Sequence, residues 1–307
     1  MQNHEPLLKV KNLRQHFVTS GHYTVKAVDG VDFVIYPGET YGLVGESGSG
    51  KSTIGRSLIR LYKPTGGQIE FNGMDISGKM DRVTTGRLRV EMQMIFQDPM
   101  ACLNPRKKVG EIIAQGLDIH HLYTSKSERK EKVSEMLRKV GLAPEHSDRY
   151  PHQFSGGQRQ RVGIARALIM NPKLVIADEC ISALDVSIQA QVVNLMQSLQ
   201  AETGTTYLFI AHDLSMVKYI SNRIGVMHMG HLVETGTTEE IFSYPVHPYT
   251  KSLLSAIPRP NPKSERLRVA QSYDYKEQGV DYSKGLQHHL GGSHLVLATD
   301  EELVKWV

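Results

Sequence analysis

Apolar and polar residues alternate over the first part of the chain in a pattern that predicts β-strands. Residues 7–18 and 24–36 alternate and are rich in Val, Phe and Ile, which is typical of antiparallel strands. A short strand over 68–71 is followed by Asn72-Gly73, a strong hairpin signal. The N-terminal part is therefore predicted to form an antiparallel β-subdomain.

The pattern changes after about residue 79, where charge density rises. Over 126–141 the apolar residues recur at helical spacing, at Val133, Met136, Leu137 and Val140. Helices and short apolar strands then alternate, with helices over 158–170 and 187–200 and strands over 174–177 and 206–211. This alternation predicts an α/β core with a mostly parallel sheet and helices on its faces, interrupted by a helical insertion subdomain at about 98–165.

The regular pattern loosens after residue 245, where prolines become frequent. A short amphipathic segment over 249–257 predicts a helix, and the last forty residues are polar and irregular up to an apolar run over 294–298. We therefore expect a main domain over 1–245 and an accessory region over 246–307.

The composition is that of an ordinary globular protein, with 40% hydrophobic and 22% charged residues among 307. A net charge of +4 is too mild to predict nucleic acid as a partner. The two cysteines, Cys102 and Cys180, lie far apart and predict no disulfide framework. The first residues lack the features of a secretory signal, and no apolar run is long enough to span a bilayer, so we expect a cytosolic chain.

A glycine-rich sequence follows the apolar strand 40–44 and precedes a predicted helix over 51–61. It reads Gly45-Glu46-Ser47-Gly48-Ser49-Gly50-Lys51-Ser52-Thr53 and matches the phosphate-loop pattern. Glycines let the backbone N–H groups approach phosphate oxygens, and the helix directs its positive end at the same anion. We expect Lys51 to reach the β- and γ-phosphates and Ser52 to ligate Mg²⁺. The alternative, a glycine-rich turn before a helix, does not explain the preceding strand.

A second glycine-rich loop, Phe154-Ser155-Gly156-Gly157-Gln158, opens the helix predicted over 158–170. It is another anion-binding helix N-terminus. Two such loops, far apart in the sequence, could both face one nucleotide only if two chains meet. The sequence therefore predicts a site shared between two subunits.

Polar residues end three of the predicted strands. Asp178 and Glu179 follow the strand over 174–177, and we expect Asp178 to hold Mg²⁺ through water and Glu179 to orient or deprotonate the attacking water. His212 ends the strand over 206–211 and could contact the γ-phosphate. Gln97 ends a strand before the insertion and could sense Mg²⁺ or the water. Taken singly, each could be an ordinary exposed or structural side chain; their order after a phosphate loop favours the functional interpretation.

Together these residues resemble the ATP-binding subunit of an ABC transporter. The resemblance covers about residues 7–245 and implies a Walker A loop at 45–53, a Q-loop at Gln97, a signature at 154–158, a Walker B strand with a catalytic Glu at 174–179, a D-loop at 182–185 and a switch His at 212. The signature begins with Phe154 where Leu is common, and Cys180-Ile181 stands where Pro-Thr is usual. The resemblance also implies an aromatic residue that stacks on adenine: Tyr23 is the candidate, with Phe17 and His22 as rivals.

Three stretches narrow the resemblance to the oligopeptide and dipeptide importer ATPases, and among them to the F-type subunits of oligopeptide permeases. They are residues 25–31, 98–106 and 247–254. Some members of this group carry a C-terminal cysteine cluster for an iron–sulfur centre; this sequence has no cysteine after Cys180, so we expect no such cluster.

This resemblance implies a peripheral ATPase on the cytoplasmic face of the membrane that drives peptide uptake with ATP and Mg²⁺. Its implied partners are a second, non-identical ATPase subunit of the D type, two membrane permease subunits and an external peptide-binding protein. Two alternatives remain open from the residues. One is a soluble ABC ATPase acting on ribosomes or DNA, although such proteins commonly have two cassettes or a long coiled-coil insertion. The other is an exporter subunit, or an importer subunit for nickel or another small solute.

Overall fold

The structure is a computed structural model that describes residues 5–19, 23–257, 272–275 and 279–307. His22, one of the rival candidates for adenine stacking, lies outside the described residues.

Twelve strands are present in the described residues. They are β1 (Leu8–Val18), β2 (Thr24–Ile35), β3 (Thr40–Val44), β4 (Gly66–Phe71), β5 (Met74–Asp75), β6 (Met92–Ile95), β7 (Leu174–Asp178), β8 (Thr206–Ala211), β9 (Arg223–His228), β10 (His231–Thr237), β11 (Leu286–Gly291) and β12 (His294–Ala298). They form a four-stranded antiparallel sheet, in the order β2-β1-β4-β5, and an eight-stranded sheet, in the order β11-β12-β10-β9-β3-β8-β7-β6.

Helices connect and cover these strands. They are α1 (Lys51–Leu58), α2 (Arg82–Glu91), α3 (Pro99–Cys102), α4 (Val109–His120), α5 (Lys126–Lys139), α6 (Gly156–Leu168), α7 (Val186–Thr203), α8 (Leu214–Ile220), α9 (Thr238–Ser243), α10 (Pro248–Ser255) and α12 (Asp300–Trp306), with the 3₁₀ helices η1 (Pro144–Asp148) and η2 (Pro151–Gln153). Among the described residues, no helix combines the length and apolar character needed to cross a bilayer.

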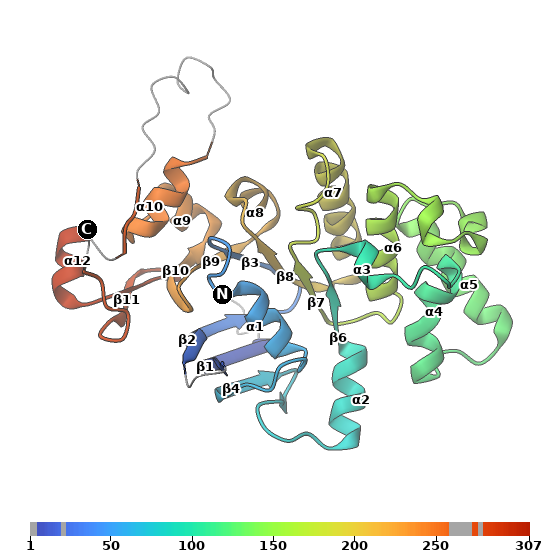
Figure 1. The fold of residues 1–307 in the computed structure, drawn as a ribbon, viewed down its shortest axis with the longest axis horizontal. Coiled ribbons are helices and arrows are strands. Elements are labelled where there is room, and N and C mark those ends of the chain that lie inside the picture. Colours follow the sequence, from blue (N-terminus) through green and yellow to red (C-terminus); the bar gives the residue numbers. More distant parts are fainter. Residues whose placement is uncertain (1–4, 20–22, 258–271, 276–278) are drawn as a thin grey trace, which may run out of the picture.

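The predicted α/β architecture is confirmed. Strands β6, β7, β8, β3 and β9 run parallel, and the N-terminal β-subdomain lies against this sheet with α1 between them (Figure 1). Helices α4, α5 and α6, green in Figure 1, form the predicted helical subdomain at the end of the sheet beyond β6. Its apolar residues, including Ile113, Leu137 and Ile164, are fully buried in a core shared with one face of the sheet.

Two predicted elements differ from the structure. The helix expected over 51–61 ends at Leu58, because Arg60 adopts a left-handed backbone (φ +63°) and its guanidinium donates to the carbonyls of Ser77 and Gly78. This tertiary contact overrides the local helical pattern.

The C-terminal stretch expected to be irregular contains strand β11. It pairs with β12, and β12 pairs with β10, so the C-terminal hairpin continues the main sheet (Figure 1). Strand β11 has alternating half-buried and exposed positions but few apolar residues, which is why its pattern did not predict a strand. Strands β9 and β10 were likewise not predicted from the sequence.

Candidate functional site

The phosphate loop lies between β3 and α1, and close backbone contacts require glycine at two of its positions. Gly45 has φ +149°, and a Cβ there would lie 2.1 Å from the Met227 carbonyl oxygen. Gly50 has φ +105°, and a Cβ there would lie 2.2 Å from the Ala27 carbonyl oxygen. Any larger residue would displace the backbone at these two positions, so the glycines fix the narrow path of the loop.

Lys51 lies inside this loop. Its Nζ donates to the carbonyl oxygens of Gly45 and Glu46, at 2.7 Å each, and to the Ser49 hydroxyl at 3.3 Å. Burial lowers the pKa of its ammonium group, and the nearby carboxylates, foremost Glu179, oppose that shift. The loop therefore presents a positive charge that its own carbonyl groups hold in place.

Ser52 and Asp178 form an oxygen pair beside the loop. The Ser52 hydroxyl donates to Asp178 Oδ1 at 2.7 Å, and Arg56 Nη2 lies 3.9 Å from Asp178 Oδ2. Asp178 is almost completely buried, and burial raises the pKa of its carboxyl while Ser52 and Arg56 oppose the rise. A hydroxyl and a carboxylate are hard oxygen ligands of the kind Mg²⁺ uses together with phosphate oxygens, so these residues fit that metal.

Glu179 is held just past the end of β7. Its backbone is left-handed (φ +45°), its N–H donates to the Ile210 carbonyl, and its carbonyl accepts from the Ser182 N–H. This turn directs the carboxylate between two neighbouring strand ends. Gln97 Nε2, after β6, donates to Glu179 Oε2 at 2.8 Å, and His212 Nδ1, after β8, lies 3.9 Å from Glu179 Oε1.

These groups converge because parallel neighbouring strands end at the same edge of a sheet. A pocket of about 210 Å³ joins the phosphate loop to two of the strand-end residues. It is lined by Ala27, Ser47, Gly48, Gly50, Lys51, Ser52, Thr53, Gln97 and Glu179. His212 contacts the group through Glu179 but does not line the pocket. The arrangement offers backbone donors and a cation for phosphates and a carboxylate for a water.

The second glycine-rich loop begins α6 and does not line this pocket in the same chain. Ser155 caps the helix: its hydroxyl accepts from the Gln158 N–H, and the Gln158 side-chain oxygen accepts from the Ser155 N–H. A Cβ at Gly156 would meet its nearest neighbour, Leu184, at 3.9 Å, an ordinary contact, whereas one at Gly157 would approach Ile188 to 2.7 Å. Packing within the chain thus accounts for glycine at position 157 but not at position 156.

The two departures from the usual motifs are both packed in the core. Phe154 is buried and its ring meets His146 edge-on at 5.4 Å. Cys180 and Ile181 are also buried, and burial raises the pKa of the Cys180 thiol to about 12. None of these three side chains lines the pocket beside the phosphate loop.

Tyr23 lies at the start of the hairpin strand β2 with 71% of its surface exposed, and it does not line the pocket. Its assignment to adenine stays a prediction.

Two residues near the loop were not predicted. Arg56 lies one helical turn beyond Ser52. Tyr249 is uncharged and contacts the loop through its hydroxyl, which accepts a hydrogen bond of 2.9 Å from the Glu46 N–H. Tyr249 falls in the stretch 247–254, so the sequence marked the segment but not this contact.

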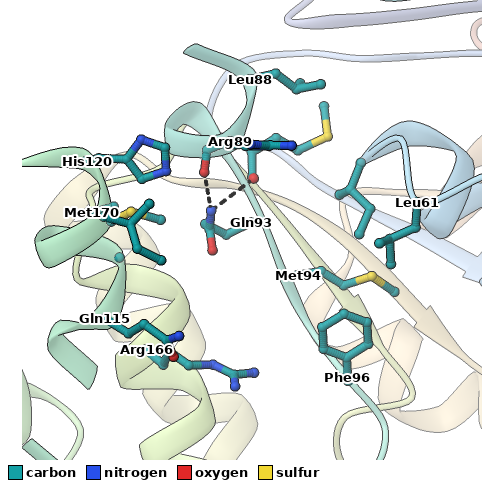
Figure 2. A pocket seen from close by; sticks show the side chains of 14 residues that line it. Leu61, Leu88, Arg89, Gln93, Met94, Phe96, Gln115, His120, Arg166 and Met170 are labelled. Carbon is teal, nitrogen blue, oxygen red and sulfur yellow. Dashed lines mark hydrogen bonds between the residues drawn. The ribbon is translucent and has the colours of Figure 1, made fainter. Parts of the chain in front are cut away.

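A groove separates the helical subdomain from the sheet. Figure 2 shows its walls, with Met94 and Phe96 beside Leu61 on one side and Gln115, Arg166 and Met170 of the helical subdomain on the other. Its volume is about 420 Å³. Ile119 and Leu61 line it with 63% and 60% of their surfaces exposed, so the groove presents apolar surface to solvent.

A phosphate loop before α1, a carboxylate pair at the end of β7 and a parallel sheet define a phosphate-loop nucleoside triphosphatase. Comparison with known proteins narrows this class. Residues 28–182 match the family described as ABC transporter, and residues 233–280 match the family described as the C-terminal region of oligopeptide/dipeptide transporters. The chain belongs to the ABC transporter family and is an ATPase subunit of that family.

Similar proteins include the oligopeptide transport ATP-binding protein OppF of Bacillus subtilis, 59% identical over 97% of this chain and 98% of the relative. The dipeptide transport ATP-binding protein DppF of Lactococcus lactis is 53% identical over 98% of this chain and 97% of the relative.

Among solved structures, the dimeric cassette MJ0796, in a post-hydrolysis state with ADP and Pi, is 29% identical with a TM-score of 0.69, covering 75% of this chain and 98% of that one. The cassette cbiO1 of Clostridium perfringens, part of the ABC transporter complex cbiONQ, is 27% identical with a TM-score of 0.71, covering 86% and 98%. These likenesses agree with the architecture described above.

Proposed function

We propose that this chain is the ATP-hydrolysing subunit of an importer that takes up oligopeptides or dipeptides across the cytoplasmic membrane. The observation that carries the ATP chemistry is the pocket in which the phosphate loop, Gln97 and Glu179 meet. The peptide class is supported by relatives that carry oligopeptide or dipeptide transport in their names and match nearly the whole chain, including its C-terminal region.

ATP binding is assigned to the phosphate loop. The backbone of residues 45–53 would surround the phosphates, with Lys51 balancing their charge and the N-terminus of α1 directed at them. Mg²⁺, when bound, would be held by Ser52, Asp178 and Gln97, and it supplies positive charge to the β- and γ-phosphates. The oxygen pair formed by Ser52 and Asp178 supports this assignment.

Hydrolysis is assigned to Glu179. Its carboxylate would take up a proton from the attacking water as the water oxygen bonds to the γ-phosphorus. The bond from that phosphorus to the β–γ bridging oxygen breaks, ADP leaves with the electron pair, and the products are ADP and inorganic phosphate. Gln97 holds one carboxylate oxygen through its amide, which leaves the other oxygen available for the water. His212, which lies near the second oxygen of Glu179, would contact the γ-phosphate.

The site is completed by another chain. The Ser155-Gly156-Gly157 loop of this subunit would grip the nucleotide on a partner's phosphate loop, and the partner's loop would grip the nucleotide here, with Gln158 shaping the helix start. Packing within the chain does not require glycine at position 156, and this, with the dimeric state of the similar cassette MJ0796, supports the arrangement. Binding of ATP would favour the closed pair, and loss of the γ-phosphate would release it. We infer a non-identical partner of the D type.

Coupling to transport is assigned to the groove in Figure 2. It lies between the sheet and the helical subdomain, and Phe96 in its wall directly precedes Gln97. The exposed apolar side chains of Ile119 and Leu61 suit an amphipathic helix from a membrane permease. Two permease subunits and an external peptide-binding protein would complete the importer, which places this chain peripherally on the cytoplasmic face of the membrane.

The test is uptake by the purified complex in lipid vesicles. With ATP on the side of this subunit, a labelled pentapeptide should accumulate, and a non-hydrolysable ATP analogue should support no accumulation. Permease proteins should co-purify with the tagged chain. Recovery of ribosomes or nucleic acid without membrane protein would refute the proposal, as would accumulation of nickel or another small solute in place of peptide.

A further inference from the structure

The C-terminal region contacts the phosphate loop through one hydroxyl group. The Tyr249 hydroxyl accepts a hydrogen bond of 2.9 Å from the Glu46 N–H, although the two residues are far apart in the sequence. Tyr249 is only 1% exposed, so packing within the chain holds its hydroxyl in place without a nucleotide.

The Glu46 N–H belongs to the same peptide group as the Gly45 carbonyl, which accepts from Lys51 Nζ at 2.7 Å. The Gly45–Glu46 peptide group is therefore hydrogen-bonded to Tyr249 through its N–H and to Lys51, the proposed phosphate-binding lysine, through its carbonyl. Because Gly45 has no side chain to restrict rotation, the orientation of this plane depends on its hydrogen bonds. Rotation of the plane would move an oxygen that holds Lys51.

Tyr249 is itself positioned by the C-terminal region. The buried carboxylate of Glu234, in β10, accepts hydrogen bonds from the N–H groups of Val246 and His247, at the start of α10, at 2.8 and 3.1 Å. It also forms a hydrogen bond of 2.8 Å with the ring of His294 in β12. His247 Nδ1 in turn accepts from the Tyr249 N–H at 3.1 Å.

The Tyr249 ring packs on His228 with their centroids 4.2 Å apart, and His228 directly follows Met227, whose carbonyl lies against Gly45. Strand β9 and helix α10 therefore both contact the phosphate loop. The contacts form a continuous path from the C-terminal hairpin to the loop.

We propose that Tyr249 is a positioning residue for the phosphate loop, through which the C-terminal region sets the chain's affinity for ATP. The hydroxyl fixes the Gly45–Glu46 peptide and so keeps Lys51 where phosphate is bound. This inference rests on the proposed role of the loop in ATP binding. It gives the accessory region a function in the nucleotide site of its own chain.

The test compares Tyr249→Phe with Tyr282→Phe in the full-length chain. Tyr282 is a matched control, because its buried hydroxyl lies 2.7 Å from His228 Nδ1 in the same aromatic cluster and does not touch the loop. Titration with a fluorescent ATP analogue and Mg²⁺ should give a dissociation constant raised about fivefold by Tyr249→Phe, the effect of one ordinary hydrogen bond, and changed less than twofold by Tyr282→Phe.

In the assembled complex, Tyr249→Phe should raise KM for ATP by a similar factor with kcat nearly unchanged, since binding energy is lost without loss of the catalytic groups. A merely structural defect would instead lower kcat by reducing the active fraction. Unchanged affinity in Tyr249→Phe, or an equal loss in Tyr282→Phe, would overturn the inference while leaving the ATPase assignment intact. A wild-type chain that bound no nucleotide would overturn both.

Discussion

Replacement of Glu179 by Gln separates the chemistry of the site from its architecture. In the structure, Gln97 Nε2 lies 2.8 Å from Glu179 Oε2. Glutamine has the same length as glutamate, and its one side-chain oxygen can still accept this hydrogen bond. The substitution removes one negative charge beside the buried Asp178, whose pKa is raised mainly by burial and further by Glu179. The folded chain should therefore be no less stable, and ATP should bind at least as tightly.

The rate should fall by the contribution of a general base. Such groups contribute about 10²- to 10⁴-fold, which corresponds to about 3 to 5 kcal/mol in the activation free energy. The lower bound applies if Gln97 and His212 still orient the water, since Gln97 lies within hydrogen-bonding distance of residue 179 and His212 within 4 Å. Removal of the base leaves these two groups in place.

The assay must report on this chain rather than on its partner. A photo-crosslinkable ATP carrying a radioactive γ-phosphate is incubated with the assembled complex and then illuminated. In the Glu179→Gln complex the label should remain on this chain, and in the wild type it should be lost within the same time. Glu239→Gln, at an exposed position of α9, is the matched control and should behave as wild type. Loss of label from Glu179→Gln at the wild-type rate would refute the assigned role.

Two further predictions concern the groove and the C-terminal cluster. Ile119→Glu should weaken co-purification of permease at least tenfold without changing ATP affinity, whereas Val83→Glu, also exposed but outside the groove, should not; equal effects of both would contradict the assignment. Burial lowers the pKa of His228 to about 4 and of His247 to about 3, so the unfolded chain binds more protons below pH 6.5. The free energy of unfolding should then fall on acidification by up to about 1.4 kcal/mol per pH unit for each histidine. The thermal unfolding midpoint, measured between about pH 7 and pH 5, reports this change. A midpoint that does not fall, or an equally steep pH dependence of the midpoint in His247→Gln, would contradict the prediction.

The sequence predicted the parts of the fold that local pattern controls. The phosphate loop has fixed spacing, and the apolar strands over 174–177 and 206–211 are buried from end to end, so both were recognisable. Strand β11 was missed because it lies at the sheet edge and carries polar residues such as His288 and His289. The helix end at Leu58 was missed because a distant contact of Arg60 decides it.

The site was predictable in its residue types but not in its supports. Their positions at strand ends predicted functional roles for Gln97, Glu179 and His212, and the structure brings the three together because adjacent parallel strands end at the same edge of the sheet. The contact from Tyr249 to Glu46 could not be predicted, since it joins a loop and a helix through a tertiary fold and has no spacing signature. The left-handed backbone of Glu179 was also not visible, because Glu has no preference for that conformation.

The central claim is that one ATP is gripped by two chains, and substitution of Gly156 by Ala tests it most directly. A Cβ at this position would come no closer than 3.9 Å to its nearest neighbour, Leu184, which is an ordinary contact. The variant chain should therefore fold, and the ATP affinity of the isolated chain should be unchanged. With the matching glycine of the partner also replaced, the ATPase rate of the assembled complex should fall at least tenfold. A complex that hydrolyses ATP at the wild-type rate would contradict the shared site.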